Sequence, residues 1–186
     1  MADNEFGYTS WGMDWVRLAQ PLKVSKPEPL LPRAYSIARN NLVQTEIENT
    51  IVRATIHRGA EASVTYLELT PLSAATITAI GKLIPAETLT LTDEHRAALA
   101  EHGITVKPQL ARTDCSCRAR TERCVHMLAT CYALARRVDE TPWLALDLQG
   151  YRTGATAASA TGETGPARWT SIDTLDPATF FGVTTG

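Results

Sequence analysis

The sequence contains no uninterrupted apolar run of about 18 residues, the length that a membrane-spanning helix requires. Its first ten residues hold neither a basic stretch nor an apolar one, so we expect no secretory signal. Without such a signal the expected location is the reducing cytoplasm, where cysteines serve as metal ligands or buried thiols more often than as disulfides. These absences predict a cytoplasmic chain with no membrane partner.

The sequence also has no signature of an enzyme. It has no glycine-rich phosphate loop, no nucleophile elbow and no recognisable pair of catalytic carboxylates. His57, His95 and His102 are scattered, and the last two lie seven residues apart on the face of an expected helix. A surface position explains such histidines better than a catalytic site. The sequence therefore predicts a protein that is not an enzyme.

The chain does have enough apolar residues for a core, and its charge is unevenly distributed. Hydrophobic residues make up 44% of the 186 positions, and the formal net charge is −2. Residues 107–137, however, carry seven basic and two acidic side chains, a local charge of +5, and they contain all four cysteines. We therefore expect the functional chemistry of the protein in this basic stretch.

β-Branched residues alternate with polar ones from Leu42 to Leu69, with turn residues at 48–50 and 58–61. This pattern predicts a three-strand antiparallel meander with one apolar face, and Ile104–Val106 resembles a further short strand. The helices expected to cover the sheet lie at Ala74–Leu83, at Asp93–His102 after the N-cap Thr92, at 127–138, and in a short stretch after Pro142. The predicted fold class is α+β, an antiparallel sheet of three to four strands covered by helices, in a domain over 37–150.

The two ends of the chain differ from this domain in composition. Residues 1–36 combine aromatics with four prolines, which favours a short helix around Met13–Ala19 followed by an extended arm. Residues 151–168 are mainly Gly, Ala, Thr and Ser and are expected to form a flexible linker. Residues 169–186 regain aromatics, which is typical of a docking segment. The candidate partner-docking side chains are Trp11, Trp15, Trp169, Phe180 and Phe181. For Trp11 and Trp15 the alternative is packing onto the domain core.

A cluster of soft ligands follows the spacing Cys115-x-Cys117-x6-Cys124-x-His126. Three thiolates and one imidazole suit one tetrahedral zinc ion, and four protein ligands make the site structural. In extended chain, residues i and i+2 point the same way, so Cys115 and Cys117 can converge on one ion. Cys124 must then lie in the loop before the amphipathic helix, with His126 in its first turn. We therefore predict a zinc knuckle over 113–126 that leads into the helix.

Two alternatives to zinc exist for these cysteines. A disulfide between Cys115 and Cys117 would close a very small, strained ring. Buried thiols would leave the position of His126 unexplained. Cys131 lies on the apolar stripe of the helix and is interpreted as a core residue.

The pattern Cys-x-Cys-x6-Cys-x-His before an alanine-rich helix resembles the SWIM zinc finger of bacterial, actinobacterial-type proteins. The segments at 6–12 (FGYTSWG), 33–39 (RAYSIAR), 138–143 (VDETPW) and 176–181 (DPATFF) are similar to flanking motifs of those proteins. The resemblance implies a DNA-binding or protein-binding module, in bacteria often encoded near helicase-like Swi/Snf-type ATPases.

Two functions are compatible with these observations. The first is a protein-interaction subunit of a larger, DNA-associated complex, with a Swi/Snf-type ATPase as one candidate partner. The alternative is direct, largely sequence-independent nucleic-acid binding through the basic knuckle. The candidate phosphate contacts are Arg112, Arg118, Arg120, Arg123, Arg136 and Arg137.

Overall fold

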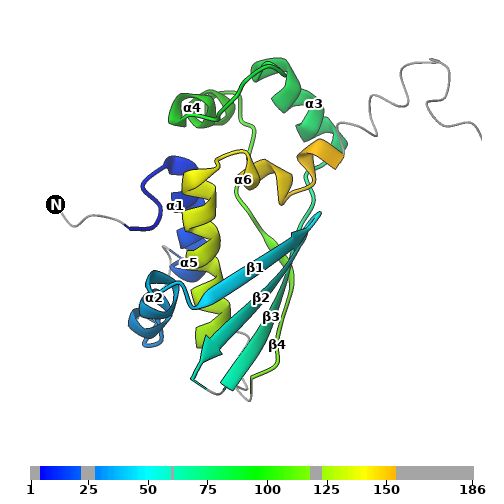
Figure 1. Ribbon diagram of the computed structural model, residues 1–186. Coiled ribbons are helices and arrows are strands. Elements are labelled where there is room, and N and C mark those ends of the chain that lie inside the picture. The colour runs from blue at the N-terminus through cyan, green and yellow to red at the C-terminus, as the bar shows by residue number, and fades with distance from the viewer. Residues whose placement is uncertain (1–4, 22–27, 60, 118–122, 154–186) are drawn as a thin grey trace, which may run out of the picture.

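The computed structural model describes residues 5–21, 28–59, 61–117 and 123–153. These residues form an α+β fold, as the sequence predicts (Figure 1). Four antiparallel strands make one sheet in the order β1-β2-β3-β4: β1 (Val43–Glu48), β2 (Ile51–Arg58), β3 (Glu61–Leu69) and β4 (Leu110–Cys115). The helices are α1 (Ser10–Ala19), α2 (Leu31–Arg39), α3 (Ala74–Leu83), α4 (Asp93–Glu101), α5 (Val125–Glu140) and α6 (Leu144–Asp147).

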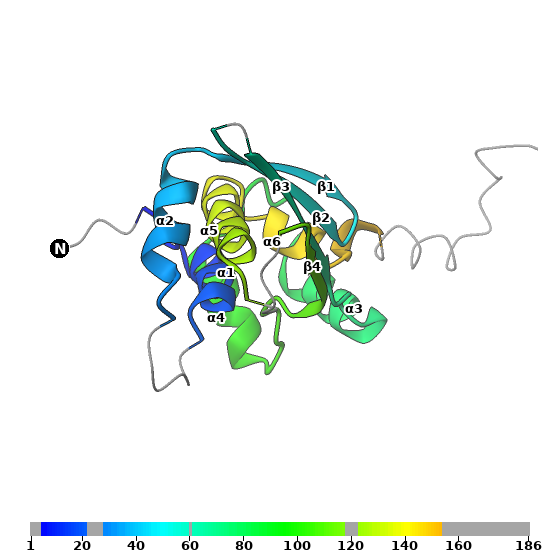
Figure 2. The same cartoon turned by 90° about the horizontal axis from the view of Figure 1, so that it is seen from below.

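Helix α5 forms the centre of the molecule, between the sheet and the two N-terminal helices. It lies against the inner face of the sheet, and α1 and α2 pack on α5 (Figures 1 and 2). The inner face of β2 and β3 presents Val52, Ala54, Ile56 and Leu67, all at most 1% exposed. Removing this apolar surface from water is the main driving force for the layered arrangement. No element among the described residues covers the outer face of the sheet (Figure 2).

The helix starts follow local capping chemistry. The side chains of Thr9, Ser73 and Thr92 accept hydrogen bonds from the first-turn amides of α1, α3 and α4. Helix α3 has the bounds that the sequence predicts, and α4 begins at the predicted residue and ends one residue earlier. None of the described helices is long and apolar enough to cross a membrane.

The N-terminal part of the chain differs from the predicted arm. Helix α2 already begins at Leu31, with Pro32 in its first turn, where the missing N–H of proline costs no intrahelical bond. The extended arm is therefore wrong for residues 31–36, and the predicted boundary between 36 and 37 falls inside a helix. Trp11 and Trp15 are buried at 2% and 0% exposure, which confirms the core alternative and removes both from the candidate docking residues.

The fourth strand is also placed differently. Residues 104–106 form no strand, although Val106 is buried and its carbonyl accepts a hydrogen bond from Gln149 Nε2 at 3.0 Å. The alternation of apolar and polar residues at 104–106 reflects the burial of Val106 within a loop. The actual strand, β4, pairs with β3 and runs directly to Cys115. Most of the predicted linker, and the docking candidates Trp169, Phe180 and Phe181, lie outside the described residues.

Candidate metal centre

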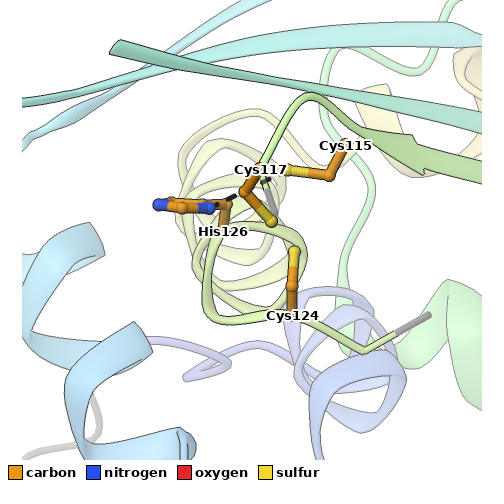
Figure 3. Close-up of side chains that lie close together, drawn as sticks. All are labelled: Cys115, Cys117, Cys124 and His126. Carbon is orange, nitrogen blue, oxygen red and sulfur yellow. Dashed lines mark hydrogen bonds between the residues drawn. The ribbon is translucent and has the colours of Figure 1, made fainter. Parts of the chain in front are cut away.

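The four predicted ligands come together at the junction of β4 and α5. Cys115 is the last residue of β4, and Cys117 follows two positions later. Cys124 is the N-cap of α5, and His126 lies in the first turn of the helix. One ligand atom from each of the four lies within 4.8 Å of the others, and the side chains point toward one another (Figure 3). The predicted positions of all four relative to the strand and helix are confirmed.

Neighbouring groups hold the thiols in place. Thr65 is fully buried and lies opposite Cys115 in the β3–β4 register, with its hydroxyl 3.5 Å from the Cys115 Sγ atom. The Met127 N–H donates to the Cys124 Sγ atom at 3.4 Å, so this thiol replaces the usual oxygen cap of a helix. The Thr130 hydroxyl donates to the His126 carbonyl at 2.9 Å and stabilises the same turn. The cluster is therefore attached to both the sheet and the helix.

Without a bound metal, the surroundings shift the pKa values of two thiols in opposite directions. For Cys115, burial acts to raise the pKa, but hydrogen bonds from Thr65 and Cys117 outweigh burial and bring the pKa below its ordinary value. For Cys124, burial raises the pKa to about 12, and the neighbouring Cys115 adds to this shift. A bound cation would have to displace the Cys124 proton, so metal binding is expected to release protons.

The donor set fits a metal ion. In a tetrahedral site with metal–sulfur and metal–nitrogen distances near 2.3 and 2.0 Å, donor atoms lie roughly 3.5–3.8 Å apart. The Cys115 Sγ atom lies 3.8 Å from His126 Nδ1, which already fits this range. All four donor atoms lie within 4.8 Å of one another, so the cluster needs only a small contraction to hold an ion. Cys115, Cys117, Cys124 and His126 could therefore hold one metal ion. A hollow of about 290 Å³, lined by Leu30, Arg33 and three of these ligands, gives access to the cluster.

Three of the candidate phosphate-binding arginines donate hydrogen bonds to other parts of the chain. Arg123 donates to the carbonyl oxygens of Leu18 and Ala19, at 3.2 and 2.7 Å, and so caps the C-terminus of α1. Arg136 donates to the Ala38 carbonyl at 2.8 Å.

Arg137 similarly donates to the carbonyl and hydroxyl of Thr45, at 3.2 and 2.7 Å. The guanidinium carbon of Arg136 also lies 4.9 Å from the centre of the Phe6 ring. Arg123, Arg136 and Arg137 thus stabilise the chain itself. Arg112 is exposed on β4, whereas Arg118 and Arg120 lie outside the described residues.

One important residue was not recognised in the sequence. The buried carboxylate of Asp139, at the end of α5, accepts hydrogen bonds from Gly7 N at 2.6 Å, Tyr8 N at 3.3 Å and Thr9 N at 2.9 Å. The Thr9 hydroxyl donates a fourth, at 2.7 Å. Segments 6–12 and 138–143, which the sequence analysis treats separately, are therefore in contact through Asp139. No local pattern pairs them, because 130 residues separate Thr9 from Asp139.

Comparisons with protein-family models, with curated proteins and with solved structures give no match for this chain.

Proposed function

We propose that this protein is a non-enzymatic, SWIM-type zinc module that acts as a protein-interaction subunit of a larger, DNA-associated complex. The donor set supports the first part. Three thiolates and one imidazole fill the four positions of a tetrahedral zinc ion, which leaves none for an activated water or a substrate. Zinc in such a site contributes to folding free energy and has no catalytic role.

Zinc is proposed over other ions because of ligand softness and geometry. Thiolate-rich tetrahedral sites favour zinc, whereas calcium and magnesium take oxygen ligands. The ion would join the end of β4 to the start of α5, the two elements that supply the ligands. Thiolate ligands persist in a reducing compartment, which accords with the cytoplasmic location expected for the chain.

The hydrogen bonds that the arginines make within the chain favour protein binding over nucleic-acid binding as the proposed function. Among the four candidate arginines that the structure describes, three donate to carbonyl oxygens of the chain itself, and only Arg112 is exposed. Phosphate binding needs several cations that are free to contact the backbone of a nucleic acid. The outer face of the sheet, by contrast, offers a mixed surface with the exposed apolar side chain of Val64. Such a surface suits a protein partner, for which the family resemblance suggests a Swi/Snf-type ATPase.

DNA binding at two salt concentrations separates the two functions. The proteins to compare are the wild type, the Arg112→Ala/Arg118→Ala/Arg120→Ala variant, and Arg33→Ala as a control at another exposed arginine. We expect no salt-dependent binding of wild type to duplex or single-stranded DNA at low ionic strength. Salt-dependent binding that is lost in the triple variant but kept in the control would establish the nucleic-acid function instead. A pull-down with and without nuclease then tests the complex, since partner capture should survive nuclease treatment.

A further inference from the structure

The outer face of the sheet has a defined hollow. In the strand register, Arg53 on β2 lies opposite Tyr66 on β3, and Tyr66 lies opposite Asp114 on β4. A depression of about 500 Å³ is lined by these three residues together with Val64 and Arg112. Val64 is 41% exposed, which is unusual for a β-branched residue in an interior strand of a sheet. The hollow therefore combines an aromatic ring, an apolar side chain, two guanidinium groups and the Asp114 carboxylate, which accepts a hydrogen bond from Cys115 N at 2.8 Å.

The two arginines at this hollow lack partners within the described part of the chain. Glu46 lies directly across from Arg53, and Glu68 lies directly across from Arg112, yet neither ion pair forms. Neither guanidinium donates a hydrogen bond to any described residue. Other arginines are engaged, as Arg96 is with Asp14 at 2.7 Å. Two exposed and unengaged cations beside an aromatic ring favour a ligand that carries both carboxylates and apolar groups.

The end of the described chain lies near this face. Gly150 lies next to Thr50 in the β1–β2 turn, and the Thr50 carbonyl accepts a hydrogen bond from Leu69 N at 2.8 Å. From Leu69 the distance along β3 to Tyr66 is about 10 Å. Fifteen residues, 154–168, precede Trp169, and a flexible chain of that length and composition has an end-to-end distance of about 20 Å. The length of this segment therefore matches the distance to the hollow.

The residues that follow position 168 carry aromatic and acidic side chains. Residues 169–186 contain three aromatics, no basic side chain and two carboxylates, Asp173 and Asp176. Their two carboxylates can pair with Arg53 and Arg112, the two unengaged arginines of the hollow. The acidic neighbours Glu46, Glu68 and Asp114 on the same face leave the aromatic contacts to supply most of the affinity. A tethered segment needs little intrinsic affinity, because short linkers give an effective concentration in the millimolar range.

We propose that residues 169–186 dock in cis onto the outer face of the sheet. Their aromatic side chains contact Tyr66 and Val64, and their carboxylates pair with Arg53 and Arg112. In the free protein the chain covers its own exposed sheet face, and anything else that binds this face has to displace the segment. The inference goes beyond the proposed function and does not depend on it, since it involves no partner and no metal.

Photocrosslinking in the full-length chain tests the proposal. Thr55 faces outward on β2 opposite Val64, so the substitution Thr55→p-benzoylphenylalanine places a photoreactive group at the hollow without removing any proposed contact. Irradiation at low micromolar concentration should give a crosslink within one chain that maps to 169–186. The same substitution at Leu89, which is 95% exposed in the loop between α3 and α4, should give none.

Charge reversal gives the second arm of the test. In the photoreactive chain, Arg53→Glu together with Arg112→Glu should lower the crosslink yield at least fivefold, whereas Arg33→Glu on α2 should leave it unchanged. The double substitution Phe180→Ser/Phe181→Ser, at positions outside the described residues, should lower the crosslink yield to a similar extent. Absence of a crosslink to 169–186 would overturn the proposal, as would a crosslink found only between two chains. An unchanged yield in the charge-reversed chain, with an unchanged melting temperature, would overturn the ionic contacts.

Discussion

A β-carbon on Gly12 would lie 2.0 Å from Oδ1 of Asp139, much closer than any two such atoms can approach. Gly12 lies in the first turn of α1, and Asp139 lies in the last turn of α5. Only a residue without a side chain allows the carboxylate to reach the amides of Gly7 and Thr9. This contact fixes the N-terminal segment on the central helix, and it makes α1 part of the domain.

Gly12→Ala is therefore expected to destabilise the protein by about 1–3 kcal/mol, the usual cost of forcing extra atoms into a packed region. Gly81→Ala on α3 is the matched control, because the nearest atom to its new β-carbon, Tyr151 Oη, would lie at 3.7 Å. The control should stabilise the protein by about 0.5–1 kcal/mol through helix propensity. Urea denaturation measures both. Equal and small effects would show that Asp139 does not need the space at Gly12.

Asp139→Asn tests the carboxylate itself. The amide keeps the shape of the side chain, but its nitrogen cannot accept the hydrogen bonds that both carboxylate oxygens now accept. We expect a loss of about 1.5–3 kcal/mol in the free energy of unfolding, the range for hydrogen bonds to a charged group. Glu140→Gln, at the exposed neighbouring position, should change it by less than about 0.5 kcal/mol. Similar values for the two variants would contradict the role of Asp139.

The features that the sequence predicts well are those with local causes. The strands β1 to β3, the cap Thr92 and the ligand spacing all depend on neighbouring residues. Strand β4 was missed because its sequence, LARTDC, has little β-branched character, and it is a strand because β3 pairs with it.

The roles of Asp139, Arg123, Arg136 and Arg137 could not be predicted, because their contacts join residues that are far apart in the sequence. Charge in the sequence does not show whether a guanidinium meets solvent or a distant carbonyl. Arg137, for example, reaches a carbonyl 92 residues away. Such contacts follow from the tertiary packing of α5 on its neighbours.

Arg123→Gln tests whether this arginine is structural. It removes the cap on the Leu18 and Ala19 carbonyls and should cost about 1–2 kcal/mol of stability, while leaving the metal content unchanged. Arg112→Gln, at an exposed position on β4, should change stability by less than about 0.5 kcal/mol. Thermal or urea unfolding with metal analysis provides both readouts. An Arg123 variant as stable as the Arg112 variant would return Arg123 to the candidate phosphate contacts.

Cys131 gives a prediction for alkaline pH. Burial raises the pKa of this thiol to about 12, whereas a thiol in the unfolded chain titrates near 8.5 to 9. The neutral buried thiol stabilises the fold fully below the unfolded pKa, and this stability is lost as pH rises toward 12. Cys131→Ala should cost about 1–2 kcal/mol at pH 7 because of the cavity, and its deficit should vanish near pH 10. A deficit that stays constant from pH 7 to pH 10.5 would contradict the burial of the neutral thiol.

The most direct test of the proposed zinc knuckle is the metal content of the purified protein, prepared without chelator and measured by elemental analysis. The account predicts one equivalent of zinc per chain in the wild type and in Cys131→Ala. Cys117→Ser should lose the metal and, with it, on the order of 10 kcal/mol of binding free energy that holds β4 to α5. Less than half an equivalent in the wild type, or full zinc content in Cys117→Ser, would contradict a structural site built from Cys115, Cys117, Cys124 and His126.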